Sequence, residues 1–464
     1  MFQYDFMDSM THQAAVFASN LQYEDIPADV IAIVKRSLRD HYAVAIAGST
    51  QPVNEKLRSF IQEVCGSGEK TVRVIGSCQR FTVERAALIN GASGHALDYD
   101  DCQDEIHGHP SVVVWTVVIT LGELYHISGV QAICAYIAGM EVMCKLCGAI
   151  EKTHYGKGWH ATGTGGVIGA AIAAAKIMGM DAEDTVNTLS LACSFASGVR
   201  GNFGSMAKPI HAGWAAQNGI TAAYMTKAGI TAAPDILEKK CGFIDCFSSA
   251  LPDECVHYFS RIGTVYSVLE PGLQIKPFPC VRAAAWPVCA AIDLRKRFPE
   301  VRATETIKQV IVTVQPWQNT TMIYPDPQTG LQAKFSGEYC VSRALVYGKL
   351  VLSDFRDDAV FDPAVRQMMV KCIIYIAKDL QEYDAKPTII VKMADGREFE
   401  GKCTYFLGHK KNPMNEQQHL EKYYSCVSGL IGRKRAEQGE SMISNLEQLS
   451  DIADLNDLLY PAEQ

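Results

Sequence analysis

The chain has 464 residues, a hydrophobic fraction of 48% and a formal net charge of −8. That length exceeds what one hydrophobic core usually supports, so we expect two domains. The composition is that of an ordinary globular protein rather than a disordered one. The negative charge, with no long block of lysine and arginine, argues against a nucleic-acid partner.

The amino terminus, Met1–Phe6, lacks a basic region followed by an apolar stretch, so we expect no secretion signal. The most apolar segments, Val112–Leu121 and Gly165–Met180, are shorter than the roughly 20 residues that cross a membrane. Sixteen cysteines without disulfide-framework spacing are typical of reduced thiols. We therefore expect a cytoplasmic protein with no membrane partner. Cys144 and Cys147 have a metal or redox spacing, but without a second pair we interpret them as part of a buried helix.

Up to about residue 260 the apolar residues recur with helical spacing. This pattern predicts helices over Pro27–Ala47, Val83–Leu97, Val112–Leu124, Gly129–Ala149, Gly165–Met178 and Ala182–Ser197. Several of these segments are apolar on nearly all sides and rich in alanine and glycine. Such helices must be buried between other helices, with small residues allowing close approach.

The pattern changes after Pro271. Ile307–Val314 is β-branched and predicts a strand, and an Asp-Gly turn predicts a hairpin of Thr388–Met393 with Arg397–Cys403. Helices are predicted over Cys340–Leu352 and Pro363–Ala377. The predicted fold is mainly α: an all-helical domain (1–267, rejoined by 405–464) and a smaller α/β domain (268–404).

Four segments place ionisable side chains beside glycine or proline: Asp98–Pro110, Tyr155–Gly166, Gly198–Gly213 and Gln274–Arg282. We expect Lys208 to lie in an irregular, exposed loop, because glycines precede it and a proline follows it. Taken alone, such residues more often belong to helix caps or solvated loops than to a functional site. Their co-occurrence indicates shaped loops around a ligand.

Two other interpretations are weaker. Gly163–Gly169 fits a dinucleotide-binding signature, but the strand that should precede it is missing. A metal site formed by Asp98, Asp100, His107 and His109 has acceptable ligands, but their spacing matches no helical ligand motif.

The same segments resemble the MmgE/PrpD family, which includes 2-methylcitrate dehydratase, cis-aconitate decarboxylase and iminodisuccinate epimerase. The most specific matches are His95–Asp101, Gly108–Ser111, Gly158–His160, Lys208–Gly213 and Lys276–Cys280. Within the family the chain is most similar to the shorter, epimerase-like branch, on the segments Thr153–His160, Asn202–Met206, Tyr324–Leu331 and Lys334–Ser336.

This resemblance implies a large helical domain, a smaller α/β lid domain, a homodimer, a small polycarboxylate substrate and no metal or organic cofactor. It implies that Asp98, His109, His160, Lys208 and Lys276 line the active site. The chain departs from the family pattern at Cys102, where decarboxylases have threonine. It also lacks the histidine that some relatives carry shortly after Lys276.

We therefore predict the following roles. His109 and His160 transfer protons, Asp98 orients a histidine, and Lys208 stabilises charge on a substrate carboxylate. The substrate-binding residues are predicted to be Lys276, His211, Cys102 and Arg282, with Arg282 in place of the missing histidine.

The predicted function is a cofactor-independent lyase of the dehydratase or decarboxylase type. Three alternatives stay open at this point: an epimerase of a dicarboxylate such as iminodisuccinate, a metal-dependent hydratase or hydrolase, and a non-catalytic binding protein.

Overall fold

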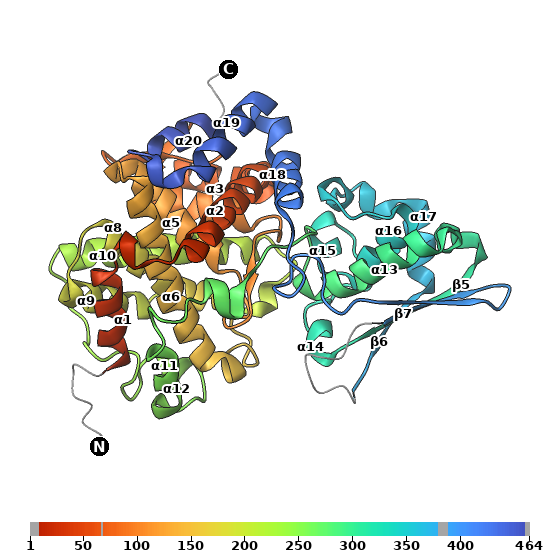
Figure 1. Cartoon of the computed structure of the whole chain (residues 1–464), viewed down its shortest axis with the longest axis horizontal. Helices are drawn as coiled ribbons and strands as arrows, with labels where there is room; N and C mark the ends of the chain where they lie inside the picture. The colour runs from red at the N-terminus through yellow and green to blue at the C-terminus, as the bar shows by residue number, and fades with distance from the viewer. Residues whose placement is uncertain (1–8, 66–67, 379–387, 460–464) are drawn as a thin grey trace. The chain divides into compact units, whose positions relative to one another are not determined.

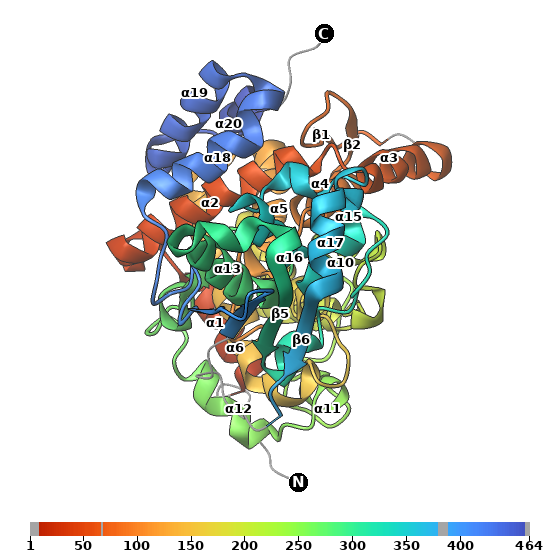
Figure 2. The same ribbon diagram turned by 90° about the vertical axis from the view of Figure 1, so that its right-hand side faces the viewer.

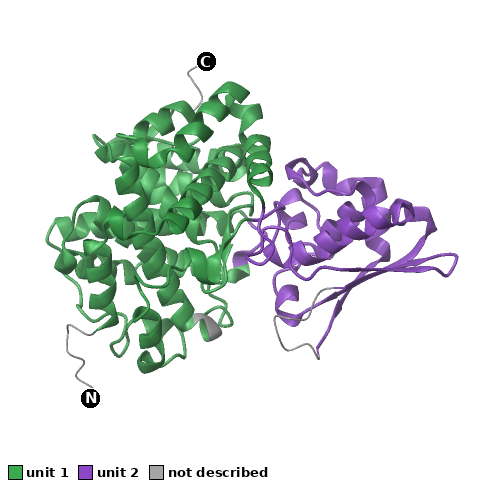
Figure 3. Ribbon diagram, viewed as in Figure 1, with its two compact units in different colours: residues 1–201, 206–275, 415–464 green, residues 202–205, 276–414 purple. Residues whose placement is uncertain are grey.

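The computed structural model describes residues 9–65, 68–378 and 388–459. The chain divides into two compact units (Figure 3). Unit 1 comprises residues 1–201, 206–275 and 415–464, and unit 2 comprises residues 202–205 and 276–414. Unit 1 is helical and unit 2 contains the main sheet, so the predicted fold class is confirmed. The predicted domain ends, 267 and 404, precede the corresponding unit ends, 275 and 414.

Unit 1 is built from helices that are far apart in the sequence. Those of its first part are α1 (Met10–Asn20), α2 (Ala28–Gly48), α3 (Pro52–Val64), α4 (Val83–His95), α5 (Pro110–Tyr125), α6 (Gly129–His154), α7 (Ala161–Thr164), α8 (Gly166–Ile177), α9 (Ala182–Cys193), α10 (Ala207–Lys227), α11 (Phe243–Phe247) and α12 (Pro252–Phe259). The C-terminal part adds α18 (Glu416–Ile431), α19 (Arg433–Ser444) and α20 (Ala453–Leu459).

Two short antiparallel pairs complete unit 1: β1 (Thr71–Arg73) with β2 (Arg80–Thr82), and β3 (Cys102–Gln103) with β4 (Leu273–Gln274). In the second pair Cys102 is opposite Gln274. This pair ties the segment that precedes unit 2 to the loop between α4 and α5.

The core of unit 1 consists of helices that are apolar on most sides, as the sequence predicts. Helix α6 is long and apolar enough to cross a membrane by length and composition, but 94% of its most apolar window is buried inside the protein. Burial on all sides is what such a composition favours in a core helix. Cys144 and Cys147 are both buried in α6, in agreement with the buried-helix interpretation, and all sixteen cysteines are free thiols.

Small residues set the closest approach between helices of this core. Gly91 of α4 faces Gly213 of α10, and a Cβ atom added at Gly213 would lie 2.2 Å from the carbonyl oxygen of Leu88. Only glycine allows the two backbones to pack at that distance. The consequence is a fixed spacing between the C-terminal end of α4 and the N-terminal end of α10.

The C-terminal segment returns to the first long helix. Figure 2 shows α18 and α19 beside α2, and the two helices pack against it. Arg39 of α2 joins them through ion pairs with Glu416 at 2.5 Å and Glu440 at 2.8 Å. Segments from opposite ends of the sequence thus form one layer.

Unit 2 contains a four-stranded sheet in the order β6-β5-β7-β8. Its strands are β5 (Ile307–Val314), β6 (Cys372–Ile376), β7 (Thr388–Met393) and β8 (Glu398–Lys402), and its helices are α13 (Ala285–Arg297), α14 (Pro316–Asn319), α15 (Gly330–Ala333), α16 (Gly337–Tyr347) and α17 (Pro363–Lys371). Only β5 and β6 are parallel. Helices α13, α16 and α17 cover one face of the sheet (Figure 1).

The predicted strand at Ile307–Val314 and the hairpin around Gly396 are confirmed, and Gly396 has the positive φ of 91° that its turn requires. The predicted helix over Pro363–Ala377 is wrong in its second half. Helix α17 ends at Lys371, and the next five residues form β6. The apolar run Cys372–Ile376 is β-branched and pairs in parallel with β5, because a short apolar run fits either period and tertiary pairing decides.

Candidate active site

The loop between α4 and α5 carries the first group of ionisable side chains. Helix α4 ends at His95, and α5 begins at Pro110 with His109 as its N-cap residue. Pro110 suits this position, because the first turn of a helix needs no N–H donor there. Asp98 has φ +51°, in the left-handed region that residues other than glycine rarely adopt. Such a conformation persists only where the surroundings hold it in place.

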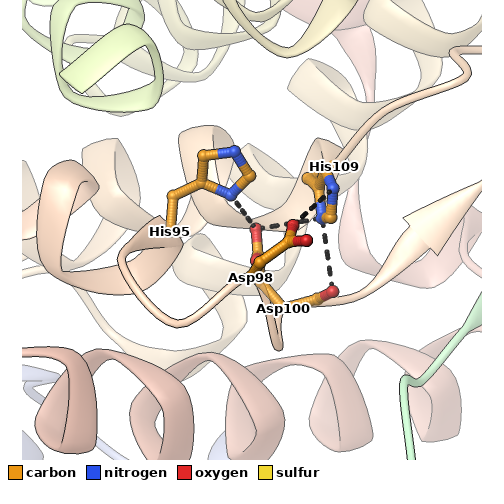
Figure 4. A group of neighbouring side chains, drawn as sticks. All are labelled: His95, Asp98, Asp100 and His109. Carbon is orange, nitrogen blue, oxygen red and sulfur yellow. Dashed lines mark hydrogen bonds and ion pairs between the residues drawn. The ribbon is translucent and has the colours of Figure 1, made fainter. Parts of the chain in front are cut away.

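Two carboxylates of this loop lie among basic side chains (Figure 4). Asp100 Oδ2 lies 2.8 Å from His95 Nδ1 and 3.2 Å from His109 Nδ1. Asp98 Oδ1 lies 3.5 Å from His109 Nε2 and accepts a 2.6 Å hydrogen bond from Lys208 Nζ. All five residues are buried, with at most 8% of their surface exposed. Both ring nitrogens of His109 face carboxylate oxygens, as a doubly protonated imidazolium requires.

A second pair of histidines continues this group. His160 is the N-cap residue of α7, and its Nδ1 lies 3.1 Å from Nδ1 of His211 in α10. One of these nitrogens must donate and the other accept. The His160 ring stacks on His95 with centroids 5.6 Å apart, and His95 meets His109 edge to face at 4.6 Å. Four imidazoles therefore form one continuous buried cluster.

Glycines hold the His160 loop against the loop that precedes α10. The backbone N–H of His160 donates to the carbonyl of Gly198, at 3.1 Å. A Cβ atom at Gly163 would lie 2.4 Å from the carbonyl oxygen of Ser197. The glycine-rich sequence Gly163–Gly166 therefore permits close approach of two backbones, and a dinucleotide is not needed to explain it.

Lys208 does not lie in an exposed loop, as the sequence had indicated. It is the second residue of α10, and only 4% of its surface is exposed. Pro209 follows it within the first helical turn, where proline is tolerated because the N–H groups have no intrahelical partner. Lys208 and His211 therefore lie on the same helix, which fixes their spacing.

Asp100 and His109 shift each other's pKa in opposite directions. Burial alone would lower the pKa of His109, but the nearby Asp100 and Cys102 raise it to about 10. Burial would raise the pKa of the Asp100 carboxyl, but His109 and His95 lower it well below its usual value. At neutral pH the two side chains are therefore an imidazolium and a carboxylate.

The other imidazoles of the cluster are neutral. Burial lowers the pKa of His95 to about 3, although Asp100 opposes this shift. Burial and the charge of Lys208 lower the pKa of His160 well below its usual value, and that of His211 to about 4. The site thus holds one protonated imidazole beside three unprotonated ones.

The structure brings six of the eight predicted site residues together in unit 1: Asp98, Cys102, His109, His160, Lys208 and His211. Cys102 Sγ lies 3.8 Å from His109 Nδ1. The other two, Lys276 and Arg282, belong to unit 2. Lys276 is 2% exposed, and the Arg282 guanidinium lies about equally far from the rings of Trp286 and Trp317, at 5.9 and 5.8 Å.

Sequence reasoning gave no proton-transfer or substrate-binding role to two members of the cluster, His95 and Asp100. Asp100 was predicted only as a ligand in the alternative metal site, and His95 only as part of a family motif. Their spacing, with His95 ending a helix and Asp100 five residues later, was the available signal. Two other residues of the segment point elsewhere: Asp101 accepts from Ser111 N, and His107 lies against the ring of Tyr155.

The cluster also has the composition of a metal site. One ligand atom from each of His95, Asp98, Asp100 and His109 can be chosen so that all four lie within 4.8 Å of one another. The predicted set contained His107 in place of His95. Imidazole with carboxylate suits zinc and similar divalent ions, although Lys208 already neutralises Asp98 in this arrangement.

Comparison with known proteins agrees with the resemblance. The chain matches the MmgE/PrpD N-terminal domain over residues 12–254 and the MmgE/PrpD C-terminal domain over residues 278–448. It therefore belongs to the MmgE/PrpD family and is an enzyme, a lyase or isomerase of that family.

Curated relatives share the full length of the chain. Human cis-aconitate decarboxylase is 26% identical over 465 residues, which cover 98% of the chain and 95% of the relative. Cis-aconitate decarboxylase of Aspergillus terreus is 27% identical over 476 residues, covering 97% and 96%. The mouse enzyme of the same name is 25% identical, covering 98% and 94%. These names support the predicted lyase type and give no support to the epimerase alternative.

Proposed function

We propose that the protein is a cofactor-independent lyase of a small tricarboxylate, of the decarboxylase or dehydratase type, with cis-aconitate as the first candidate substrate. Full-length similarity to cis-aconitate decarboxylases supports this choice. The observation that carries it is the geometry of the buried cluster: His109 lies between the carboxylates of Asp98 and Asp100, and His160 lies among other imidazoles. These surroundings raise the pKa of His109 and lower that of His160. Paired groups with separated pKa values are what acid–base chemistry at carbon needs.

Lys208 is the basic side chain of the cluster that we assign to a substrate carboxylate. Lys208 Nζ is buried and held by Asp98, so its position is fixed before a ligand arrives. A preorganised donor of this kind stabilises charge that develops on a substrate carboxylate by about 2.7–4 kcal/mol. We assign Lys208 to the carboxylate next to the reacting carbon.

The decarboxylation of cis-aconitate balances with one proton. Loss of CO2 from the carboxylate on the methylene carbon leaves an electron pair on that carbon. The pair delocalises across the adjacent double bond toward the carboxylate at its far end, where Lys208 stabilises it. His109 then donates its proton to the far carbon, so the double bond shifts and a five-carbon dicarboxylate is released.

Dehydration uses His109 as the acid again and adds His160 as a base. Neutral His160 removes a proton from the carbon next to a carboxylate, and protonated His109 donates to the leaving hydroxide. Asp98 and Asp100 orient His109 between them in both reactions. The requirement that the two reactions share is a proton donated by His109.

Lys276 and Arg282 are proposed to bind the remaining carboxylates. Lys276 is two residues beyond Gln274, which pairs with Cys102 at the edge of the cluster. Arg282 stands near the position where some relatives have a histidine. A substrate range that differs from that of the decarboxylases would follow from this change and from Cys102.

The decisive experiment is incubation of the protein with cis-aconitate, citrate, 2-methylcitrate and iminodisuccinate in heavy water, followed by NMR. We expect product formation from a tricarboxylate: decarboxylation should leave one deuterium bound to carbon in the product, whereas dehydration should remove a carbon-bound proton and add no deuterium. His160→Ala and Lys208→Ala should each lower kcat/KM by at least about a hundredfold without loss of folding. Near-normal turnover in both variants would contradict the assignment, and epimerisation of iminodisuccinate alone would favour the isomerase alternative.

The quaternary structure is a separate proposal. The family resemblance supports a homodimer, so sedimentation should give about twice the 50.8 kDa mass of the chain. A monomer across the micromolar range would remove this proposal without touching the chemistry.

A further inference from the structure

We propose that Lys422, on α18, is a positioning residue for the Asp98–Asp101 segment and acts together with Asp40 of α2. Neither side chain was among the predicted site residues. Both are buried, with 5% and 6% of their surface exposed. All the residues concerned belong to unit 1.

The ammonium group of Lys422 contacts Asp40 of α2 and Tyr99 of the active-site loop. Nζ lies 2.6 Å from Asp40 Oδ1 and donates a 2.8 Å hydrogen bond to the backbone carbonyl of Tyr99. It also lies 3.9 Å from the centroid of the Tyr99 ring. Tyr99 stands between the two carboxylates that contact His109.

The hydrogen bond to the Tyr99 carbonyl orients the Tyr99–Asp100 peptide group. Asp98 on the other side of Tyr99 has the unfavourable φ of +51°, so this segment needs external contacts to keep its shape. Asp100 follows directly, and its carboxylate contacts both His95 and His109. A displacement of about 1 Å at such a group is enough to lower a rate a hundredfold.

Asp40 is the partner that keeps a buried ammonium group in place. A lysine without a counter-ion at this depth would lose its proton or turn toward solvent. Asp40 comes from α2, and Lys422 comes from the C-terminal layer that packs on it (Figure 2). The active-site loop is thereby held by helices from the N-terminal and C-terminal parts of the chain, α2 and α18.

Lys35 provides a matched control. It also joins α2 to the C-terminal segment, through Glu447 at 2.5 Å and the carbonyl of Ser444 at 3.0 Å. These partners lie outside the active-site loop. Lys35→Met and Lys422→Met therefore remove similar ties between the same two segments, and only the second removes a contact with Tyr99.

The test combines hydrogen exchange, melting temperature and steady-state kinetics for Lys35→Met, Lys422→Met and the double variant Asp40→Asn/Lys422→Met. We expect Lys422→Met to raise amide exchange over residues 98–103 and to lower kcat at least about tenfold, with KM within about threefold. Lys35→Met should lower the melting temperature and leave loop exchange and kcat unchanged. The double variant removes both charges, so it should recover thermal stability over Lys422→Met but not kcat.

This inference rests on the proposed function only for its kinetic measurement. If the wild-type protein turned over none of the acids tested, the proposed function would fail, and loop exchange would still decide the role of Lys422. Unchanged loop exchange in a folded Lys422→Met protein would overturn the inference. So would a double variant with wild-type kcat, because charge burial alone would then explain the pair.

Discussion

His109 and His160 are the same side chain in two environments. His109 stands between two carboxylates and stays protonated, whereas His160 faces Lys208 and other imidazoles and stays neutral. Neither outcome follows from the residue type, whose ordinary pKa of about 6.5 would leave both partly charged at neutral pH. The acid and the base of the site are therefore defined by their neighbours.

The pH dependence of the reaction tests whether His109 is the general acid. Because the pKa of His109 is about 10, kcat/KM should stay near its maximum at neutral pH and fall as the pH rises through about 10. Asp100→Asn removes the carboxylate that raises this pKa, so the alkaline limb should move by about one pH unit or more toward neutrality. Initial rates from roughly pH 6 to 10.5 measure both profiles. An alkaline limb at the same pH in both proteins would exclude His109 as the acid.

The possible metal site consists of His95, Asp98, Asp100 and His109, and its role in the reaction can be tested directly. We expect exhaustive chelation with EDTA to leave the activity unchanged, because Lys208 and protonated His109 already supply the positive charge. Added Zn²⁺ should inhibit reversibly, since binding to His95, Asp98, Asp100 and His109 would displace Lys208 from Asp98. Titration of activity with Zn²⁺ and then EDTA measures both effects. Loss of activity with EDTA alone would support the metal-dependent alternative.

Helices α4 and α10 carry much of the cluster, and their spacing sets its geometry. His95 ends α4, and Lys208 and His211 lie in the first two turns of α10. The contact of Gly91 with Gly213 holds the two backbones together close to these ends. A change of helix spacing here is thus a change in the distance between catalytic groups.

Gly213→Ala should therefore affect stability and activity together. The new Cβ would meet the Leu88 carbonyl at 2.2 Å, which forces the helices apart. We expect a loss of about 1–3 kcal/mol in the free energy of unfolding and a fall in kcat/KM of about tenfold or more. Urea unfolding and steady-state kinetics measure the two effects.

Gly429→Ala is the control for this prediction. Gly429 lies in α18 with nothing within 4 Å of an added Cβ, so alanine should stabilise the protein by about 0.5–1 kcal/mol. Its activity should stay at the wild-type value. If Gly213→Ala behaved like Gly429→Ala, the close helix contact would have no role in placing the cluster.

Across the whole protein, buried ionisable groups make stability depend on pH with opposing signs. Burial lowers the pKa of His41 to about 4 and that of His95 to about 3, and it raises the pKa of Asp101 and Glu141 to about 7. Below pH 6.5 the unfolded chain binds more protons at such histidines, which destabilises the fold. The buried carboxyls bind protons in the folded state first, which opposes this effect.

His41→Met isolates one of these contributions. His41 is buried in α2, and its folded pKa lies below its unfolded value of about 6.5, so its cost appears as the pH falls from about 6.5 toward 4. Relative to wild type, the variant should gain about 2 kcal/mol in the free energy of unfolding between pH 7 and pH 5. Denaturant unfolding of both proteins at the two pH values measures this difference. A constant difference would show that the pKa of His41 is the same in the folded and unfolded states.

Local sequence patterns were sufficient for the fold class and for most elements of unit 1. The apolar repeats that predict Gly129–Ala149 and Gly165–Met178 correspond to α6 and α8, because those helices are buried on nearly all sides. Glycine and proline beside ionisable residues marked the four candidate segments, since shaped backbones need glycine and proline wherever the fold places them. The family resemblance then implied Asp98, His109, His160 and Lys208 within those segments. The β6 strand was missed, because its short apolar run is compatible with either period.

The arrangement of the cluster required the packing of helices that are distant in the sequence. Lys208 meets Asp98 across 110 residues, and Lys422 meets Tyr99 across 323. No local pattern encodes such contacts, because periodicity records which face of an element is buried and not which element covers it. The protonation states depend on those contacts in turn, since each pKa responds to the charges and burial that folding brings to it. That dependence is why only the folded structure showed that Asp100 contacts both His95 and His109 and that Lys422 reaches the same loop.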